Sequence, residues 1–296
     1  MSHQHPSYRG SILVEDAEVV SQTAWPGGQY VIVLRSPRIA ARATAGAFVH
    51  LSCDPELAMR RPLSLQRADA REGTLEILYK VVGDGTRRLS VARAGDRLSC
   101  MGPIGHGFVP EPDRPRALLV GGGVGLPPMV YLAETMASGS THRPLVCLGS
   151  EIPFPFTPRP STLMVDGMPP DVIASHPLLE SWGVASRLAS GAGFAGCYQG
   201  FVTSLATCWL ESLSPEALSQ VSVYACGPTP MLRAVARMAQ KFDLPAQVSL
   251  EEFMACAVGG CAGCAVEVAT PAGPAMKRVC VDGPVFDANA VFPPNS

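Results

Sequence analysis

Four of the ten cysteines stand close together near the C-terminal end of the sequence, and their spacing constrains the chain more than any other feature. They are Cys256, Cys261, Cys264 and Cys280, in the pattern C-x4-C-x2-C-x15-C. The other six stand singly and are typical of small buried apolar residues. Disulfides persist in oxidising compartments, and nothing else in the sequence indicates one. A shared metal site therefore explains the four cysteines better than disulfide bonds do.

The spacing of these cysteines is that of plant-type iron–sulfur sites, in which one loop supplies three thiolates and a distant cysteine the fourth. Four thiolates around two ferric ions carry excess negative charge, so backbone N–H groups have to point at the sulfurs. A loop that does this needs small residues, and it has Ala257, Gly259, Gly260, Ala262 and Gly263. Structural zinc, which usually takes two short knuckles, is the weaker alternative. The sequence predicts a [2Fe–2S] cluster on the four cysteines.

Composition limits the partners and the compartment. The formal net charge of −2 and the 16% of charged residues argue against nucleic acid or an anionic membrane as the main partner. No apolar run reaches the length of a membrane-spanning helix. Residues 1–6 lack the basic and apolar regions of a secretory signal, so we expect a cytoplasmic protein.

The first third of the chain has the pattern of an antiparallel β-structure. Short strand-like runs at residues 30–34, 47–51 and 74–82 are separated by turn residues. Such runs at close spacing predict a small barrel or sandwich. A polar, proline-rich stretch at 112–116 follows, and its composition is typical of a linker.

Strands alternate with helices after this linker. We expect strands at 117–120, 144–148 and 221–225, and helices that start near Pro127 and at Thr229-Pro230, with Thr229 as the N-cap. Met231, Val235, Met238 and Phe242 would share one face of the second helix. This alternation predicts a parallel sheet covered by helices. Residues 151–200 show no clear periodicity.

The predicted fold class is β plus α/β, in three units. These are an antiparallel barrel at 1–112, an α/β unit at 113–245 and a small cluster unit at 246–296. Length alone suggests about two domains. The third can be small because iron and sulfur would hold it together.

Two segments of the barrel have features of an anion site. Pro62 within a strand marks an edge or a bulge, and Arg61 beside it could pair with a phosphate. Gly85 and Thr86 follow a strand and open a short helix, where free N–H groups favour an anion. The alternatives are a solvated edge strand and a simple turn with Thr86 as N-cap.

Together these segments resemble the flavin-binding barrel of the ferredoxin–NADP reductase superfamily. The resemblance implies that FAD is bound and that the isoalloxazine side is lined by Arg61, Pro62, Leu63 and Ser64. It assigns the ribityl and pyrophosphate part to Leu78, Tyr79, Lys80, Gly85 and Thr86.

Two glycine turns mark the α/β unit, at residues 121–128 and 224–232, each at the carboxyl end of an expected strand, where ligands of such sheets bind. The first is not the G-x-G-x-x-G fingerprint, and no acidic residue follows about 20 positions later. The superfamily resemblance implies that NAD is faced by Gly122, Gly123, Gly125, Cys226, Gly227 and Pro228. For Cys226 the alternative is a small buried residue.

The C-terminal segment is more specific than the superfamily. Met254-Ala255-Cys256 and the run from Cys280 to Phe286 resemble the electron-transfer subunits of NAD-dependent dihydroorotate dehydrogenases. Ala257 stands where that family usually has glycine, and residues 151–200 are longer and richer in proline than its usual segment.

This resemblance implies an electron conduit in de novo pyrimidine biosynthesis. Dihydroorotate would be oxidised on a separate FMN-containing catalytic subunit, in a heterotetramer with two of each chain. Electrons would pass through [2Fe–2S] and FAD to NAD+, with no side chain of this chain acting as a catalytic acid or base. A related reductase subunit that serves a hydrogenase, a sulfur reductase or another dehydrogenase is the first alternative. The second is a non-enzymatic, zinc-stabilised binding module.

Overall fold

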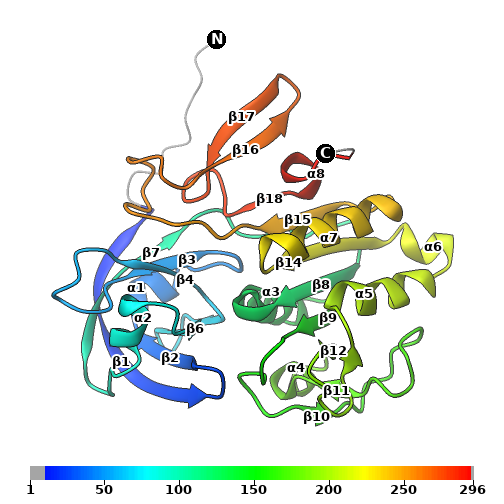
Figure 1. Cartoon of the computed structure of the whole chain (residues 1–296), viewed down its shortest axis with the longest axis horizontal. Coiled ribbons are helices and arrows are strands. Elements are labelled where there is room, and N and C mark those ends of the chain that lie inside the picture. The colour runs from blue at the N-terminus through cyan, green and yellow to red at the C-terminus, as the bar shows by residue number, and fades with distance from the viewer. Residues whose placement is uncertain (1–10, 295–296) are drawn as a thin grey trace.

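The computed structural model describes residues 11–294 and contains a barrel, an α/β unit and a small unit that lies across both (Figure 1). The barrel is a seven-stranded antiparallel sheet in the order β4-β3-β7-β1-β2-β6-β5. Its strands are β1 Leu13–Trp25, β2 Gln29–Arg35, β3 Phe48–Leu51, β4 Arg61–Ser64, β5 Arg67–Asp69, β6 Thr74–Lys80 and β7 Arg97–Ile104. The helices α1 Pro37–Ala40 and α2 Asp84–Leu89 lie in its connections.

This sheet curls on itself because β4 and β5 follow one another in the chain yet stand at opposite edges. The predicted strands at 30–34, 47–51 and 74–82 are confirmed as β2, β3 and β6, and β6 ends at Lys80. Pro62 lies in β4 at a sheet edge, as predicted, where its missing N–H breaks no ladder.

The α/β unit has a second seven-stranded sheet in the order β13-β12-β9-β8-β14-β15-β18. Its strands are β8 Arg116–Gly122, β9 Arg143–Gly149, β12 Ala185–Ser190, β13 Tyr198–Gln199, β14 Val221–Cys226, β15 Ala246–Ser249 and β18 Val285–Asp287. Only β18 pairs antiparallel. The helical segments are η1 Gly123–Gly125, α3 Leu126–Ala137, α4 Pro177–Ser181, α5 Val202–Glu211, α6 Pro215–Leu218 and α7 Thr229–Lys241. The predicted β plus α/β class is confirmed.

Helices cover both faces of this sheet. Successive strand residues point to opposite faces, and because these strands are apolar on both, each face is buried by helices. Leu119 packs in one core with residues of α3, whereas Leu118 and Val120 pack in the other with α5 and α7. In α7, Val235 and Met238 are buried, and Met231 and the C-cap residue Phe242 are partly buried in that second core. The predicted apolar face of this helix is therefore confirmed.

The predicted cap of α7 is wrong. Pro228 is the N-cap, Thr229 is the first helical residue, and no side chain caps this end. A side-chain N-cap would stabilise this helix by about 1 kcal/mol. The helix forms without one because packing of its apolar face contributes more to its stability. Residues 151–200 show no clear periodicity in the sequence. In the structure they contain the two-residue strands β10 Arg159–Pro160, β11 Ala174–Ser175 and β13, the short helix α4 and the strand β12.

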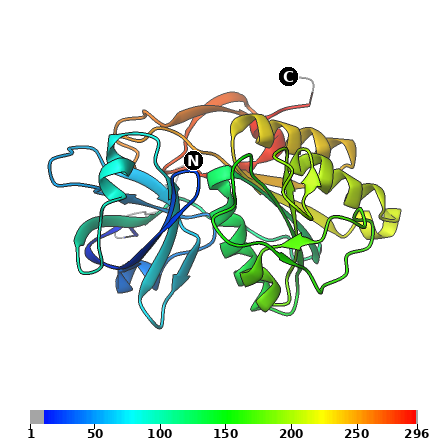
Figure 2. The ribbon, with the colours of Figure 1, turned by 60° about the horizontal axis from the view of Figure 1, so that its bottom comes forward.

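The third unit leaves the α/β sheet and returns to it. After β15 the chain forms a loop and the hairpin of β16 Ala265–Thr270 and β17 Gly273–Arg278, and then re-enters as β18 before α8 Ala288–Val291. Strand β15, which the predicted boundary at 245/246 assigns to the cluster unit, pairs with β14. Figure 2 shows this unit spanning the barrel and the α/β unit.

A shared core fixes this unit on the barrel. Phe48 and Ile104 of the barrel pack with Met254, Val279 and the cysteine segment. In addition, His106 N–H donates to the Gly283 carbonyl at 2.6 Å. The cysteine loop is thereby held against β3 and β7.

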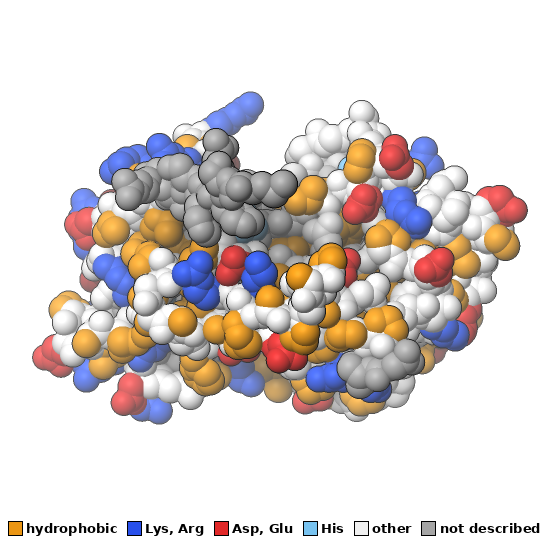
Figure 3. Space-filling model, turned by 90° about the horizontal axis from the view of Figure 1, so that it is seen from above, with side chains coloured by type: hydrophobic (Ala, Val, Ile, Leu, Met, Phe, Trp, Pro, Cys, Tyr) orange, Lys and Arg blue, Asp and Glu red, His pale blue; other side chains and the backbone are white. Residues whose placement is uncertain are grey.

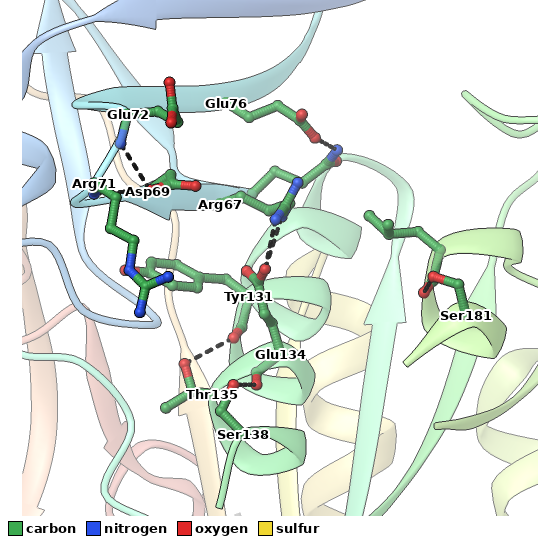
Figure 4. A network of polar contacts seen from close by, with 12 residues as sticks. Arg67, Asp69, Arg71, Glu72, Glu76, Tyr131, Glu134, Thr135, Ser138 and Ser181 are labelled. Atoms are coloured by element: carbon green, nitrogen blue, oxygen red, sulfur yellow. Dashed lines mark hydrogen bonds and ion pairs between the residues drawn. The ribbon is translucent and has the colours of Figure 1, made fainter. Parts of the chain in front are cut away.

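Polar contacts join the barrel to the α/β unit (Figure 4). Arg67 of β5 pairs with Glu134 of α3 at 2.6 Å, and its guanidinium also lies 5.4 Å from the ring centre of Trp182. Tyr131 of α3 donates to the Ala43 carbonyl at 2.9 Å. Within residues 11–294, no helix is long and apolar enough to cross a bilayer.

Candidate functional site

The four cysteines of the predicted cluster come from one loop and the end of a hairpin. Cys264 and Cys280 are buried with their sulfurs 3.3 Å apart, Cys256 is half-buried and Cys261 is exposed. None of the ten cysteines, all of which lie in the described range, forms a disulfide. The hairpin β16–β17 brings Cys264 and Cys280 together because Val279 N–H bonds to the Cys264 carbonyl at 3.0 Å.

Backbone N–H groups converge on these sulfurs. Burial alone would raise the pKa of Cys256, but N–H groups of Val258, Cys261 and Gly260, with the Cys261 side chain, bring it down to about 7. The pKa of Cys280 rises to about 12 because of burial and the Cys264 thiol, although a Gly259 N–H opposes this. Donors directed at sulfur favour thiolates, which are the form that binds iron.

The loop reaches this geometry through left-handed backbone. Gly259 has φ +81°, and a Cβ there would lie 2.5 Å from a methyl of Val281. Ala257 and Ala262 both have φ 54°, a conformation that costs an alanine more than a glycine. The Gly259 carbonyl is held by Arg278 at 3.0 Å, and the Arg278 backbone N–H donates to Asp282 at 2.7 Å.

This donor set suits an iron–sulfur cluster. All four residues are cysteines, and thiolates are the ligands that hold such clusters. A [2Fe–2S] cluster is larger than an ion and spreads its four thiolates around two irons, with N–H groups directed at sulfur. Four cysteines with such N–H groups and no other ligand type meet that requirement.

The predicted flavin segments Arg61–Ser64 and Gly85–Thr86 meet in the barrel. The Arg61 guanidinium lies so close over Gly85 that a Cβ on this glycine would overlap it. Thr86 is not the N-cap, which is Gly83. The Thr86 hydroxyl instead accepts the N–H groups of Val82 at 3.0 Å and Gly83 at 3.3 Å. Thr86 therefore shapes the turn, and Arg61 brings a positive charge to it.

The three predicted residues of β6 differ in direction. The Tyr79 ring lies inside the barrel, where its hydroxyl donates to Gln22 at 2.9 Å and it stacks on Tyr30. Burial raises the pKa of Tyr79. Leu78 points the other way and lines a cavity of about 230 Å³ between the barrel and α3, together with Gln66, Phe156 and His176. Lys80 is half-exposed at the end of the strand.

The two glycine turns of the α/β unit lie side by side, because β8 and β14 pair in parallel with Gly121 opposite Cys226. A Cβ on Gly122 or on Gly227 would meet the Met231 side chain, and one on Gly125 would overlap the Cys226 carbonyl. Gly123 has φ +57° with open space around it. Five of the six predicted residues, Gly122, Gly125, Cys226, Gly227 and Pro228, are thus brought together.

The Cys226 thiol is fully buried beneath this turn, and burial raises its pKa. The side chain therefore packs as a small neutral residue, and the backbone of Cys226 is what approaches the turn. Sequence reasoning did not single out Met231 as part of this site, although its place in the first turn of α7 was a signal.

Comparisons with known proteins agree with this geometry. Residues 251–292 match the family model described as the iron–sulfur cluster binding domain of dihydroorotate dehydrogenase B. The chain is 34% identical to the dihydroorotate dehydrogenase B (NAD(+)) electron transfer subunit of Geobacillus thermodenitrificans, over 94% of this chain and 98% of the relative. It is 30% identical to the same subunit of Shouchella clausii, over 92% and 96%.

Solved structures share the fold. The NADH-dependent reduced ferredoxin–NADP oxidoreductase structure superposes with a TM-score of 0.69 at 24% identity, over 94% of this chain and 90% of that one. A ferredoxin NADP+ reductase from Neisseria gonorrhoeae with bound FAD and NADP superposes with a TM-score of 0.55 at 15% identity, over 79% and 92%. At these identities the likeness concerns the fold alone.

Proposed function

This chain belongs to the family of electron transfer subunits of dihydroorotate dehydrogenase B, and from that membership we propose how its parts perform the activity. It is a flavin- and iron–sulfur-dependent oxidoreductase subunit that passes electrons between a dihydroorotate dehydrogenase catalytic subunit and NAD+. The main observation behind this proposal is the cysteine loop, whose N–H groups point at the Cys256 sulfur. This loop lies within residues 251–292, the segment that matches the family model.

Cys256, Cys261, Cys264 and Cys280 would hold the [2Fe–2S] cluster. When bound, the cluster carries single electrons and FAD one or two, which connects one-electron transfer to hydride transfer at NAD+. The chain's own task is to fix positions. Arg278 ties the loop through the Gly259 carbonyl, and the core with Phe48 and Ile104 seats it on the barrel.

Arg61, Pro62, Leu63 and Ser64 would line FAD, with Leu78, Tyr79, Lys80, Gly85 and Thr86 along the rest of it. The closeness of Arg61 to Gly85 supports this, because a guanidinium beside backbone N–H groups at a helix start suits a pyrophosphate. Tyr79 would contribute its backbone, as its ring is used inside the barrel.

The paired turns after β8 and β14 would face NAD through Gly122, Gly123, Gly125, Cys226, Gly227 and Pro228. Both turns lie at carboxyl ends of parallel strands, the position at which such sheets bind nucleotides. The glycines let the nucleotide approach the backbone, and the start of α3 offers N–H groups to phosphate.

The surface near the cysteines suits a protein partner. Phe253 is 94% exposed and Val258 is 51% exposed, on either side of Cys256. Seen from above, the molecule carries apolar side chains among charges of both signs (Figure 3). This supports docking of the FMN-containing catalytic subunit near the exposed Cys261, in a heterotetramer with two of each chain. The ten free cysteines support a cytoplasmic location.

The cofactor content of the purified full chain tests this proposal. We expect flavin absorption, two irons per chain and, after reduction, the electron paramagnetic resonance (EPR) signal of a [2Fe–2S] cluster. Colourless protein with one zinc per chain would instead indicate the non-enzymatic module. A chain that carries both cofactors but never binds the dihydroorotate dehydrogenase catalytic subunit would serve another partner.

A further inference from the structure

His50 is a buried side chain that the function described so far does not use. It lies in β3, is 1% exposed, and neither ring nitrogen has a hydrogen-bond partner in the described part of the chain. A buried polar group without a hydrogen-bond partner destabilises the folded chain. A ring kept at this cost indicates a role that arises in another state of the protein.

The strand register places His50 beside the proposed flavin strand, on the strand whose Phe48 meets the cysteine segment. His50 is opposite Pro62 of the flavin strand β4 on one side and Met101 of β7 on the other. Phe48, two residues earlier and so on the same face, is opposite Ser64 and packs with Cys264 and Cys280. His50 is therefore next to the flavin strand within the sheet and shares a face with Phe48, which packs on the cysteine segment.

Two backbone carbonyls favour the protonated form of the imidazole, although neither forms a hydrogen bond with it in this structure. One belongs to Arg60, just before the flavin strand, and the other to Met254, two residues before Cys256; both stabilise the protonated ring. A neutral imidazole has one N–H, whereas a protonated one has two. Only the protonated ring can donate to both carbonyls.

The charges around His50 keep it neutral as the structure stands. Burial lowers its pKa most, and the guanidinium groups of Arg60 and Arg61 lower it further. On β7, Met101 is uncharged and burial keeps the Cys100 thiol protonated. The cysteine segment presents Met254, with the exposed Glu252 earlier in the chain. Two changes would favour protonation of His50, because each brings negative charge near the ring. One is a phosphate bound by Arg61, and the other is an added electron at the cluster.

We propose that His50 is a redox-linked proton site beside the flavin strand, an inference that rests on the proposed function. One electron delivered to the cluster is accompanied by one proton that moves from water to the imidazole, where a new N–H bond forms. The ring then donates to both carbonyls, of Arg60 and Met254. When the electron leaves for the flavin, the N–H bond breaks and the proton returns to water.

The test is the pH dependence of the cluster's reduction potential, measured on the full chain with both cofactors by anaerobic titration and EPR between pH 6 and 9. Coupling of one proton to one electron shifts the potential by about 59 mV per pH unit, the tenfold factor of a one-electron couple. We expect this slope over part of the range in the unmodified chain. In His50→Gln and His50→Phe the potential should not change with pH.

His142→Gln is the matched control, because that ring is partly exposed and contacts the Glu111 carbonyl at 3.0 Å. It should keep the unmodified slope. A flat potential in the unmodified chain, or a slope retained in His50→Gln, would overturn the proposal. If His50→Phe fails to hold the cluster, His50→Gln alone decides. Absence of any cluster signal from the unmodified chain would instead contradict the proposed function.

Discussion

At the residue scale, the cysteine loop shows what a spacing can and cannot reveal. The sequence alone shows the four cysteine ligands. It also shows the small residues that the loop needs if backbone N–H groups are to approach the negatively charged sulfurs. That Gly259 needs a left-handed backbone beside Val281 is not, because Val281 lies 22 positions away and is brought there only by the hairpin. His50 was missed for the same reason, since a histidine in an apolar strand carries no signal of its neighbours.

Gly259→Ala should weaken the cluster site. The new methyl meets Val281 at a φ of +81°, which we expect to cost about 2 kcal/mol. Gly260→Ala is the matched control, because a Cβ there meets nothing within 4 Å. Iron per chain and thermal unfolding are the measurements. Equal iron content in the two variants would contradict the assigned loop geometry.

At the element scale, the six strands expected from alternating or apolar runs are confirmed as β2, β3, β6, β8, β9 and β14, whereas the shortest elements were not predicted. The strands β10, β11 and β13 have two residues each, too few for any period to appear. The cap of α7 was misplaced by one residue because Thr229 and Pro230 fit two start positions equally well. The neighbours of β4 and α2 could not be read from the sequence, because Arg61 and Gly85 meet only in the closed barrel.

Gly85→Ala should weaken FAD binding, because the added methyl displaces the Arg61 guanidinium. We expect the Kd for FAD to rise about tenfold, or about 1.4 kcal/mol. Gly83→Ala adds a methyl two residues away in open space, so its Kd should stay near that of the unmodified chain. Fluorescence titration of the flavin-free protein measures both. A tenfold loss in Gly83→Ala alone would place the phosphate elsewhere.

The start of α4 should make stability depend on pH. His176 caps this helix by accepting the Leu178 N–H at 3.2 Å, and burial lowers its pKa from 6.5 to about 4. Its contribution to stability is therefore complete above pH 6.5 and is lost as the pH falls toward 4. Between pH 7.5 and 5 we expect a loss of about 2 kcal/mol from this group.

His176→Asn keeps a cap acceptor and removes the titration. Urea unfolding at the two pH values should show a smaller loss in this variant than in the unmodified chain. Equal losses would mean that the ring of His176 becomes charged in the folded protein without cost.

At the scale of the whole molecule, the order of barrel, α/β unit and cluster unit follows from the order of the motifs. The way the third unit is anchored does not. Its first and last strands, β15 and β18, complete the α/β sheet, so the cysteine loop is an excursion from that sheet onto the barrel. Such long-range pairings leave no local pattern, yet they bring the cysteines, the flavin strand and the paired glycine turns into one molecule.

The cluster should be indispensable for one half-reaction only. Cys264→Ser should abolish electron flow from the catalytic subunit to NAD+, yet spare NADH oxidation by an artificial acceptor that takes electrons from the flavin. Cys208→Ser, at a half-buried cysteine of α5, is the control and should keep both activities. Loss of both activities in Cys264→Ser with FAD still bound would contradict this division between the two cofactor sites.

The most direct test of the central claim is an assay of the purified complex of this chain with its dihydroorotate dehydrogenase catalytic subunit. With dihydroorotate and NAD+ supplied, we expect NADH to form at the same rate as orotate, and neither chain alone should form NADH. A complex that holds every cofactor, oxidises dihydroorotate with an artificial acceptor and still forms no NADH would contradict the account.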